Sequence, residues 1–380
     1  MKVILSVEPV RFPLTGIGRY TYELARQLQT SPELTELRLF SGTGFVDQLP
    51  VATESGGTSH RLKRLVQNSR LATEAYRVLT PILKRRALRG YGDYLYHGPN
   101  FYLPPFAGRS VATFHDLSPF LWSDCAPMER VRYMQKELRL ALERGSAFIT
   151  DSEFNRQELI SQFSLSPEKV HSVPLAASEE FLPRSEQDIA PTLARHNLTY
   201  DGYSLYVGTI EPRKNLLNLL EAYRKLPIAV RQRWPLILTG YAGWRSQAIH
   251  EAIGKGAREG WARYLGFAPA ADLPHLFAGA RLFCFPSLYE GFGLPVLEAM
   301  QSGVPVVCSD SSSLPEVAGE AALACAPADV DGMAGLLLRG LEDEAWRQAA
   351  KVAGITQAAK FSWKRCALET QRVYKLVLSK

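Results

Sequence analysis

The sequence predicts an α/β protein made of two doubly wound parallel sheets that face each other across a cleft. Three observations predict this fold class. Short apolar runs rich in β-branched residues alternate with longer amphipathic stretches along the 380 residues. The alternation forms two series of about 180 and about 160 residues, each long enough for one Rossmann-like domain. The apolar runs are hydrophobic enough to need helices on both faces of each sheet.

The first series begins with the run KVILSV at residues 2–7, which predicts a strand, and an amphipathic stretch at 18–29, which predicts a helix. Further strands of this series are expected at 36–40, 94–97, 110–114 and 147–151, with helices between them. We place the first domain over residues 1–183.

The second series begins with the run YSLYV at 203–207, followed by a helix near 215–225. Its other strands are expected at 235–239, 262–265, 281–285 and 304–308. We place the second domain over residues 200–360, after a polar, proline-containing link at 174–202. No strand follows the last helix, predicted at 363–378, so we expect residues 363–380 to pack back on the first domain.

Composition excludes several classes of protein. Hydrophobic residues make up 46% and charged residues 22%, which is typical of neither a disordered nor a fibrous chain. No stretch approaches the ~18 uncharged apolar residues of a membrane span. The apolar run at the N-terminus is too short for a secretory signal. The cysteines are odd in number and lack a C-x-x-C pair, so we expect reduced core residues of a cytosolic protein and no metal framework: Cys125, Cys284, Cys308, Cys325 and Cys366.

Positive charge is concentrated in residues 61–90. This segment holds nine basic residues against the single acid Glu74, a net charge of +8, so the rest of the chain carries −2 of the formal +6. Leucine, isoleucine and valine interleave with the basic residues at roughly helical spacing. A basic amphipathic helix pair favours an anionic surface such as membrane headgroups. A solvated helix face with its apolar stripe on the core explains the pattern equally well. Nothing resembling an RNA-binding aromatic motif or a zinc finger supports nucleic acid.

The most informative stretch is RLFCFPSLYEGFGLPVLEAMQSG at 281–303. It predicts a buried strand, a glycine-rich loop and a helix that opens near Leu294. The glycines let the backbone approach a ligand, and their amides with the helix dipole form a site for anions. Two carboxylates, Glu290 and Glu298, lie on each side of that site. We interpret them as acceptors for sugar hydroxyls on either side of a diphosphate.

Two further glycine-containing loops follow predicted strands. In VGTIEPRKN at 207–215, Arg213 and Lys214 stand at the carboxyl end of a strand, where they could neutralise a leaving diphosphate without a metal. A solvated surface turn is the alternative interpretation. In LTGIGRY at 14–20, Gly16 and Gly18 give an incomplete dinucleotide fingerprint, weak by itself, that could admit a phosphate or an acceptor.

Histidines at strand ends are the remaining candidates. The strand VATF ends in His115 and Asp116, and the position at the carboxyl edge favours His115 as a ligand contact. His97 also follows a strand and is a weaker candidate for the acceptor side. The D-x-D pattern at Asp329 precedes an apolar helical stretch, so we predict a helix cap rather than a metal site. G-x-S-x-G and P-loop patterns are absent.

With these residues, the chain resembles the retaining enzymes of glycosyltransferase family 4, which have the GT-B fold. Glu290 and Glu298 match that family's E-x7-E motif, VGTIEPRKN its diphosphate loop, TGIGRY its N-terminal glycine loop, and FHD its acceptor-side histidine. LPEVAGEAA at 314–322 is similar to the branch of bacterial O-antigen mannosyl- and rhamnosyltransferases, above all the D-rhamnosyltransferases of Pseudomonas-type common polysaccharide antigen.

The resemblance implies roles for individual residues. Glu298 would hold the nucleotide ribose and Glu290 the hydroxyls of the donor sugar, with His115 as a second catalytic contact. Arg213 and Lys214 would clamp the diphosphate. Many family members have arginine where this chain has Thr209. The remaining donor contacts implied are Gly16, Gly18, Thr209, Phe292, Gly293 and Leu294.

The resemblance also implies an activity. It is the transfer of a mannose- or rhamnose-type sugar, with retention, from a nucleoside diphosphate sugar to a lipid-linked saccharide of lipopolysaccharide O-antigen. We expect the donor to be GDP-linked. The first domain would bind the acceptor and the second the nucleotide sugar. No metal or other cofactor is expected. Segment 61–90 would hold a cytoplasmic enzyme on the inner face of the cytoplasmic membrane. A nucleotide-sugar epimerase and a non-catalytic nucleotide-sugar or polysaccharide-binding protein stay open as alternatives.

Overall fold

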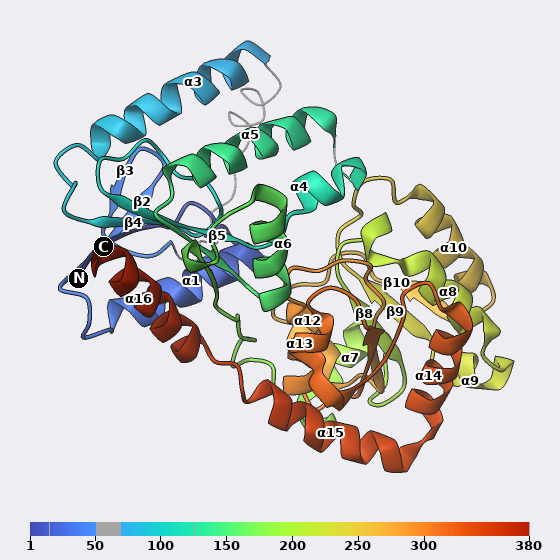
Figure 1. Cartoon of the computed structure of the whole chain (residues 1–380). Helices are drawn as coiled ribbons and strands as arrows, with labels where there is room; N and C mark the ends of the chain where they lie inside the picture. Colours follow the sequence, from blue (N-terminus) through green and yellow to red (C-terminus); the bar gives the residue numbers. More distant parts are fainter. Residues whose placement is uncertain (15, 51–69, 126, 380) are drawn as a thin grey trace.

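The computed structural model describes residues 1–14, 16–50, 70–125 and 127–379 and contains two parallel β-sheets, one in each half of the chain (Figure 1). The strands of the first sheet are, in spatial order, β3 (Gly44–Val46), β2 (Glu36–Ser41), β1 (Lys2–Ser6), β4 (Leu95–Gly98), β5 (Arg109–Phe114), β6 (Ala147–Thr150) and β7 (Val170–Ser172). Only β3 is antiparallel to its neighbour. The predicted fold class is confirmed.

Helices cover both faces of the first sheet because alternate strand residues point to opposite sides. Val3 and Leu5 of β1 face a core that includes Leu24, whereas Ile4 faces a separate core that includes Leu138. The helices of this half are α1 (Gly16–Gln29), α3 (Arg70–Ala87), α4 (Ser118–Leu121), α5 (Met128–Arg144) and α6 (Glu153–Phe163), with short 3-10 turns η1 (Ser123–Cys125) and η2 (Pro167–Lys169).

The second sheet consists, in spatial order, of β10 (Ala262–Tyr264), β9 (Leu236–Thr239), β8 (Ser204–Val207), β11 (Leu282–Phe285), β12 (Val306–Ser309) and β13 (Ala322–Cys325). All its strands are parallel. Its helices and 3-10 turns are α7 (Glu186–Arg195), η3 (Pro212–Lys214), α8 (Leu216–Lys225), α9 (Ile228–Arg233), α10 (Gln247–Arg258), α11 (Leu273–Ala278), α12 (Leu294–Gln301), α13 (Leu314–Ala318), η4 (Gly319–Ala321), α14 (Val330–Glu342) and α15 (Glu344–Ala358). Helix α8 packs against α10 and α14, while α12 packs against α11, α13 and α15.

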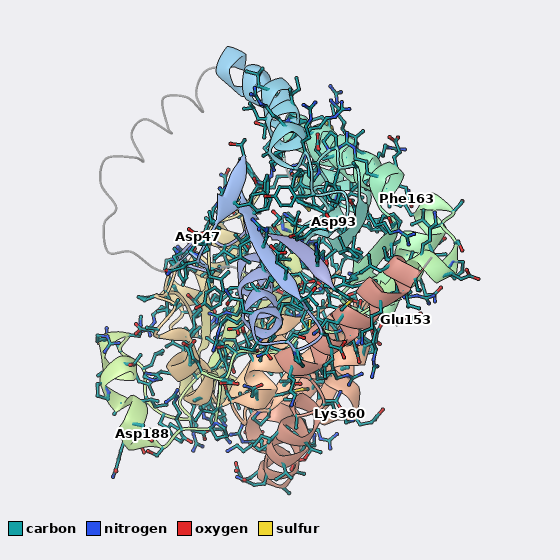
Figure 2. All side chains as sticks on the ribbon, turned by 90° about the vertical axis from the view of Figure 1, so that its left-hand side faces the viewer. Asp47, Asp93, Glu153, Phe163, Asp188 and Lys360 are labelled. Carbon is teal, nitrogen blue, oxygen red and sulfur yellow. The ribbon has the colours of Figure 1, made fainter. Side chains whose placement is uncertain are left out.

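The chain returns to its first half at the end. Helix α16 (Trp363–Ser379) packs against α1 and against strands β5 and β6, so the two termini lie near each other (Figure 1). Its buried face includes Trp363, Cys366 and Tyr374. Side chains fill the space between the sheets and their helices (Figure 2).

Some elements were not predicted. The short strands β3, β7 and β13 were missed, and the link at 174–202 contains helix α7, which packs against α11. Ser185 and Asp188 form a capping box at the start of α7, a signal that the prolines of the link obscured. Within the described residues, no helix combines the length and the apolar character needed to cross a membrane.

Candidate active site

The two most informative loops lie side by side because their strands are neighbours. Strands β8 and β11 pair in parallel, and the strand order runs outward from them in both directions. Loops at such a point diverge and leave a crevice at the carboxyl ends of the strands, which is where open α/β sheets bind ligands. The loop after β8 carries Arg213 and Lys214, and the loop after β11 carries Glu290.

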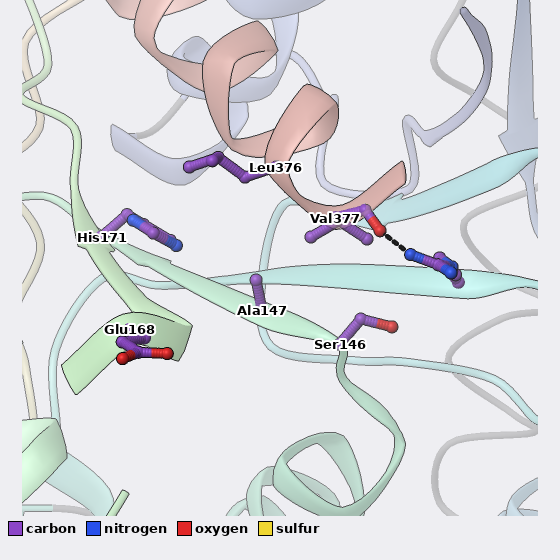
Figure 3. Close-up of a pocket in the computed structure, with 7 residues that line it drawn as sticks. Ser146, Ala147, Glu168, His171, Leu376 and Val377 are labelled. Atoms are coloured by element: carbon purple, nitrogen blue, oxygen red, sulfur yellow. Dashed lines mark hydrogen bonds between the residues drawn. The ribbon is translucent and has the colours of Figure 1, made fainter. Parts of the chain in front are cut away.

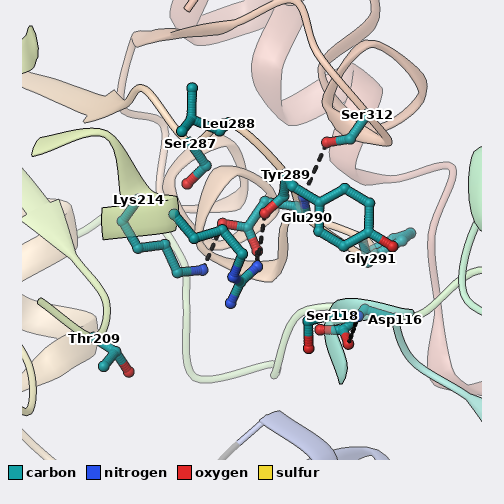
Figure 4. Close-up of polar contacts among 12 residues, drawn as sticks. Asp116, Ser118, Thr209, Lys214, Ser287, Leu288, Tyr289, Glu290, Gly291 and Ser312 are labelled. Carbon is teal, nitrogen blue, oxygen red and sulfur yellow. Dashed lines mark hydrogen bonds and ion pairs between the residues drawn. The ribbon is translucent and has the colours of Figure 1, made fainter. Parts of the chain in front are cut away.

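A buried ion pair joins these loops (Figure 4). Lys214 Nζ lies 2.5 Å from Glu290 Oε1, and Arg213 Nη1 lies 3.6 Å from Glu290 Oε2. Arg213 also donates to the carbonyl of Tyr289 at 2.7 Å and pairs with Glu211 at 2.9 Å. The predicted convergence of these cations and one carboxylate is thus present. Arg213 is held by several groups of the two loops, and Lys214, which is 8% exposed, is paired with Glu290.

Charge pairing sets the protonation of this cluster. Burial by itself raises the pKa of Glu290, but Lys214 and Arg213 outweigh it, so that pKa lies below its ordinary value. Burial lowers the pKa of Lys214, and Glu290 opposes this only in part. Burial also opposes the charge of Arg213, but Glu290, Asp116 and Glu211 raise its pKa overall. Glu290 is therefore an ionised carboxylate at neutral pH.

The start of α12 is arranged to receive an anion. Gly293, its N-cap residue, has φ +109, a conformation that favours glycine. Ser313 Oγ donates to the carbonyls of Glu290 and Phe292 and fixes the loop from behind. Within the described residues, the amides of Phe292, Gly293 and Leu294 donate no hydrogen bond. Three unpaired donors at a helix N-terminus are suited to phosphate oxygens.

Glu298 occupies the next turn of α12 and differs from Glu290. Its carboxylate accepts no hydrogen bond from the residues that the structure describes. Burial raises its pKa to about 8, and only Arg19 of α1 opposes this shift. A half-buried, unpaired carboxyl group is available to accept hydrogen bonds from a ligand.

The N-terminal glycine loop reaches the same place from the other half of the chain. A Cβ on Gly16 would lie 3.9 Å from Leu294 Cδ1. Gly18 is buried within α1. Beyond it, Arg19 and Gln301 line a cavity of about 890 Å³ between the two halves, at the Glu298 end of the site. The structure therefore brings Gly16, Leu294 and the neighbourhood of Glu298 together.

His115 lies at the carboxyl end of β5, but neither ring nitrogen is free. Nδ1 lies 2.7 Å from Asp151 Oδ2, and Nε2 lies 2.8 Å from the carbonyl of Pro99. Burial lowers the pKa of His115, but Asp151 outweighs it and the pKa is raised overall. Because a carbonyl can only accept, Nε2 carries a proton, and the raised pKa favours the imidazolium form.

The sequence suggested His97 as a residue of the acceptor side, but the structure places it in the core. Its ring is completely buried, with Nδ1 2.6 Å from the Tyr374 hydroxyl and Nε2 2.9 Å from Thr113 Oγ1. Burial lowers its pKa to about 3. It is a neutral residue that joins α16 to the first sheet.

Sequence reasoning missed the residues that join the two halves beside Glu290. The Tyr289 hydroxyl donates to Glu158 at 2.7 Å and accepts from the amide of Leu117 at 3.1 Å. Asn155 Nδ2 donates to the carbonyls of both Gly291 and His115. A Cβ on Gly291 would lie only 1.7 Å from the His115 carbonyl oxygen. Tyr289 and Gly291 stand inside the recognised motif, but Asn155 carried no signal beyond its place in a capped helix.

Other interface contacts and candidate residues complete the site. Both carboxylate oxygens of Glu316 accept the first amides of α6, those of Glu153 and Phe154, across the interface. Thr209 is half-buried on the loop after β8, apart from the ion pair in Figure 4. Asp329 caps α14 by accepting from the amide of Gly332, as predicted. No cluster of three or more metal-ligating side chains occurs in the described part of the chain.

A smaller cavity lies at the opposite edge of the first sheet (Figure 3). It measures about 150 Å³ and is lined by Arg109 and Ala147, at the amino ends of β5 and β6, and by Val377 of α16. Arg109 donates to the carbonyl of Val377. This cavity belongs to the packing of the last helix, away from the carboxyl ends of the strands where the candidate residues gather.

Known proteins are similar in sequence to this chain. Residues 194–357 match the family described as glycosyl transferases group 1. The O-antigen chain mannosyltransferase B of Escherichia coli is 47% identical over 99% of this chain and 100% of its own length. The serotype-specific mannosyltransferase WbdA of Escherichia coli is 33% identical over 68% of this chain, which corresponds to 32% of the longer relative.

Solved structures share the fold at lower identity. A sucrose-phosphate synthase from Thermosynechococcus elongatus superposes with a TM-score of 0.72 at 18% identity, covering 100% of both chains. Anabaena Alr3699/HepE, solved in complex with UDP and glucose, superposes with a TM-score of 0.70 at 18% identity, also over 100% of both chains. These neighbours confirm the GT-B arrangement. With a relative of 47% identity along its whole length, the chain belongs to the glycosyl transferases of group 1.

Proposed function

We propose that this glycosyltransferase moves a mannose-type sugar, D-mannose or its 6-deoxy relative D-rhamnose, from a GDP-linked donor to a lipid-linked saccharide of O-antigen. The observation that carries the proposal is the buried pair of Lys214 and Glu290 beside the free amides at the start of α12, the helix that also carries Glu298. The mannosyltransferase names of the Escherichia coli relatives support the sugar class and the O-antigen product.

The chemistry breaks the bond between the anomeric carbon and the diphosphate and forms a bond from that carbon to an acceptor hydroxyl oxygen. Negative charge grows on the departing diphosphate. Lys214 and the amides of Phe292, Gly293 and Leu294 stabilise this charge in a water-poor site, where fixed donors have their largest effect. These groups do so without a metal ion. The acceptor proton passes to an oxygen of the departing phosphate, so the products are the glycoside and a protonated nucleoside diphosphate.

Glu290 is better suited to holding the donor sugar than to attacking it. Its two oxygens already contact Lys214 and Arg213, and this pairing lowers the nucleophilicity of the carboxylate. The remaining lone pairs can accept hydrogen bonds from sugar hydroxyls. We therefore propose a retaining reaction in which the acceptor attacks on the same face from which the diphosphate leaves, with no covalent enzyme intermediate.

The other candidates complete the donor site. Glu298 accepts hydrogen bonds from the ribose hydroxyls, while Gly16, Gly18 and Thr209 let the backbone come close to the phosphates. His115 supplies a positive charge from the opposite half, and a contact between its Nε2 and substrate would replace the present bond to the Pro99 carbonyl.

A thermal-shift panel tests the donor class directly. Binding to the folded state raises the melting temperature, by an amount set by ligand concentration and affinity. We expect GDP and GDP-mannose to stabilise the protein and UDP and ADP to leave it unchanged at equal concentration. Stabilisation by UDP alone would contradict the GDP assignment.

Two other functions make different predictions. A nucleotide-sugar epimerase would convert the donor to its epimer without any acceptor, which chromatography of the donor after incubation would detect. A binding protein would retain GDP tightly and transfer no sugar to any lipid-linked saccharide. The charged crevice favours transfer over simple binding, because Lys214 is suited to a departing diphosphate and Glu290 to the hydroxyls of the donor sugar.

Contact with an anionic membrane is a further part of the proposal. Residues 61–69 of the basic segment 61–90 lie outside the described residues, but the end of α3 is described. There Leu79, Ile82 and Leu83 are between 49% and 60% exposed rather than packed on the core, beside the exposed residues Arg85 and Arg86. An exposed apolar stripe with basic neighbours favours a membrane-bound helix over a solvated one. Flotation with vesicles that contain anionic lipid, compared with neutral vesicles, tests this contact.

A further inference from the structure

A small pocket at the open mouth of the cleft is formed by both halves of the chain. It measures about 260 Å³ and is lined by Ser123, Asp124, Pro127, Met128, Trp244 and Arg245. The first four residues come from η1 and the start of α5, and the last two from the loop that follows β9. The pocket therefore exists only when the two halves are close together.

The mouth pocket has apolar walls that face solvent. Trp244 is 51% exposed and Met128 is 52% exposed. Covering the face of a large aromatic side chain removes apolar surface from water, so Trp244 beside Met128 suits a binding surface. The neighbouring loops carry a second exposed aromatic group, the stacked rings of Tyr241 and Phe267, whose centroids lie 4.2 Å apart.

The polar groups of the mouth pocket carry no net charge. Asp124 of one half and Arg245 of the other lie 3.8 Å apart, with their side chains 78% and 66% exposed. An exposed pair of this kind contributes little to stability. It does offer one strong acceptor and one strong donor next to an apolar face. This combination suits a neutral polyhydroxylated ligand better than a phosphate or an acidic lipid.

The mouth pocket is connected to the reaction site through short contacts. The amide of Gly243 donates to the carbonyl of Ile210, so the loop with Trp244 rests on the loop that leads to Arg213. From the other half, the thiol of Cys125 lies against the backbone of Arg213. The mouth pocket therefore adjoins the loop that carries Arg213 and Lys214.

We propose that the mouth pocket is a saccharide subsite that holds the acceptor chain one or more sugar units away from the reacting hydroxyl. This rests on the proposed function, since it deepens the acceptor assignment. The apolar face of a hexose ring packs on Trp244, and its hydroxyls bond to Asp124 and Arg245. The volume is just below the ~300–1,000 Å³ of pockets for whole drug-sized ligands, so it accommodates part of an oligosaccharide. Because both halves contribute, an occupied subsite also favours the closed cleft.

Substitution of Trp244 tests the subsite in the full-length enzyme. We expect Trp244→Ala to raise the acceptor KM for α-linked mannotriose about tenfold, since loss of one packed aromatic face costs roughly that factor. The donor KM should stay within about twofold. Trp244→Phe should restore most of the affinity. Tyr200→Ala, an exposed aromatic residue near the amino end of β8, serves as the matched control and should behave as wild type.

Saturation-transfer NMR with mannotriose gives a readout that does not need transfer activity. We expect a signal with wild type that Trp244→Ala abolishes and Tyr200→Ala retains. An unchanged acceptor KM and an unchanged NMR signal in Trp244→Ala would overturn the subsite, and so would equal losses in Tyr200→Ala. A wild-type enzyme that binds mannotriose through Trp244 but transfers no sugar would instead contradict the proposed function and leave the saccharide subsite standing.

Discussion

Glu290 and Glu298 stand eight residues apart on one loop and helix, yet their surroundings are opposite. Glu290 lies between Lys214 and Arg213, and its pKa is held below the ordinary value against the effect of burial. Glu298 has no hydrogen-bond donor among the described residues, and burial raises its pKa to about 8. The charge of Glu290 is therefore balanced by cations of the protein, whereas the carboxyl group of Glu298 is left to form its hydrogen bonds with a ligand.

The difference separates two tasks within one donor site. The Glu290 end is assembled before substrate arrives, because fixed charges that need no rearrangement stabilise a transition state most effectively. At the other end, the carboxyl group of Glu298 has no hydrogen-bond donor among the described residues, and the hydroxyls of a bound ribose would supply one. Loss of the first end should therefore mainly lower kcat, and loss of the second should mainly raise the donor KM.

The largest effect is expected when the Glu290 end loses its cation. Lys214→Ala should lower kcat about 10²- to 10³-fold, the usual consequence of removing one donor to developing negative charge. It also leaves Glu290 buried beside Arg213 alone. Steady-state transfer assays measure the loss, with circular dichroism to confirm folding. Lys225→Ala, which removes an exposed lysine paired with Asp331, is the control. A kcat within twofold of wild type would contradict the role of Lys214 in stabilising the departing diphosphate.

A second change displaces the Glu290 end without touching Glu298. In Gly291→Ala the new Cβ would lie 1.7 Å from the His115 carbonyl oxygen, so the loop or the other half of the chain must shift. We expect kcat to fall tenfold or more and the melting temperature to drop, since overpacking costs about 1–3 kcal/mol.

Gly335→Ala supplies the matched control for this change, because nothing lies within 4 Å of the added methyl group. In the interior of α14 this substitution should stabilise the protein by about 0.5–1 kcal/mol. Equal activity in Gly291→Ala and wild type would show that the contact between the halves does not position Glu290.

The Glu298 end should respond to pH. Because its pKa is about 8, the carboxylate that accepts hydrogen bonds forms as the pH rises from 7 to 9. The ratio of donor KM in Glu298→Gln to that in wild type should therefore grow over this range and reach about tenfold, which corresponds to ~1.4 kcal/mol. Using the ratio cancels the titration of Lys214. A ratio that stays constant with pH would separate Glu298 from ribose binding.

The smallest effect is on stability in the absence of ligand. The pKa of Glu298 is higher in the folded state than in the unfolded state, so the folded state holds the proton more firmly. The free energy of unfolding therefore falls as the pH rises from about 4.5 to 8. Glu298→Gln should melt about 2 °C above wild type at pH 8.5 and at the same temperature at pH 4. Calorimetry at the two pH values measures the difference in melting temperature between the variant and wild type. An equal difference at both pH values would show that ionisation of Glu298 is not its cause.

Much of the fold could be predicted because the signals were local. The helix near Leu294 was predicted from the proline in its first turn, and the structure begins α12 at that residue. Strands such as 281–285 were long apolar runs whose burial is complete. The missed strands β3, β7 and β13 lie at the edges of their sheets, and most of their residues are only partly buried, so their sequences lack the apolar run of a central strand.

The two histidines show where local signals end. Both His97 and His115 stand at the ends of predicted apolar strands, so strand position alone made each of them a candidate. Helix α16, almost 280 residues later, brings the Tyr374 hydroxyl onto His97 and seals it in the core. His115 lies at the end of the next strand, β5, at the contact with the loop that carries Gly291.

The sequence alone determined which residues stand at strand ends, and so which side chains were candidates for an anionic sugar donor, because strand and helix periods and glycine loops are local properties of the chain. Only the tertiary structure decided which candidates meet. Lys214 and Glu290 are 76 residues apart and pair because β8 and β11 are neighbours in the sheet. The contrast between Glu290 and Glu298 follows from burial and nearby charge, and these quantities exist only after the chain has folded.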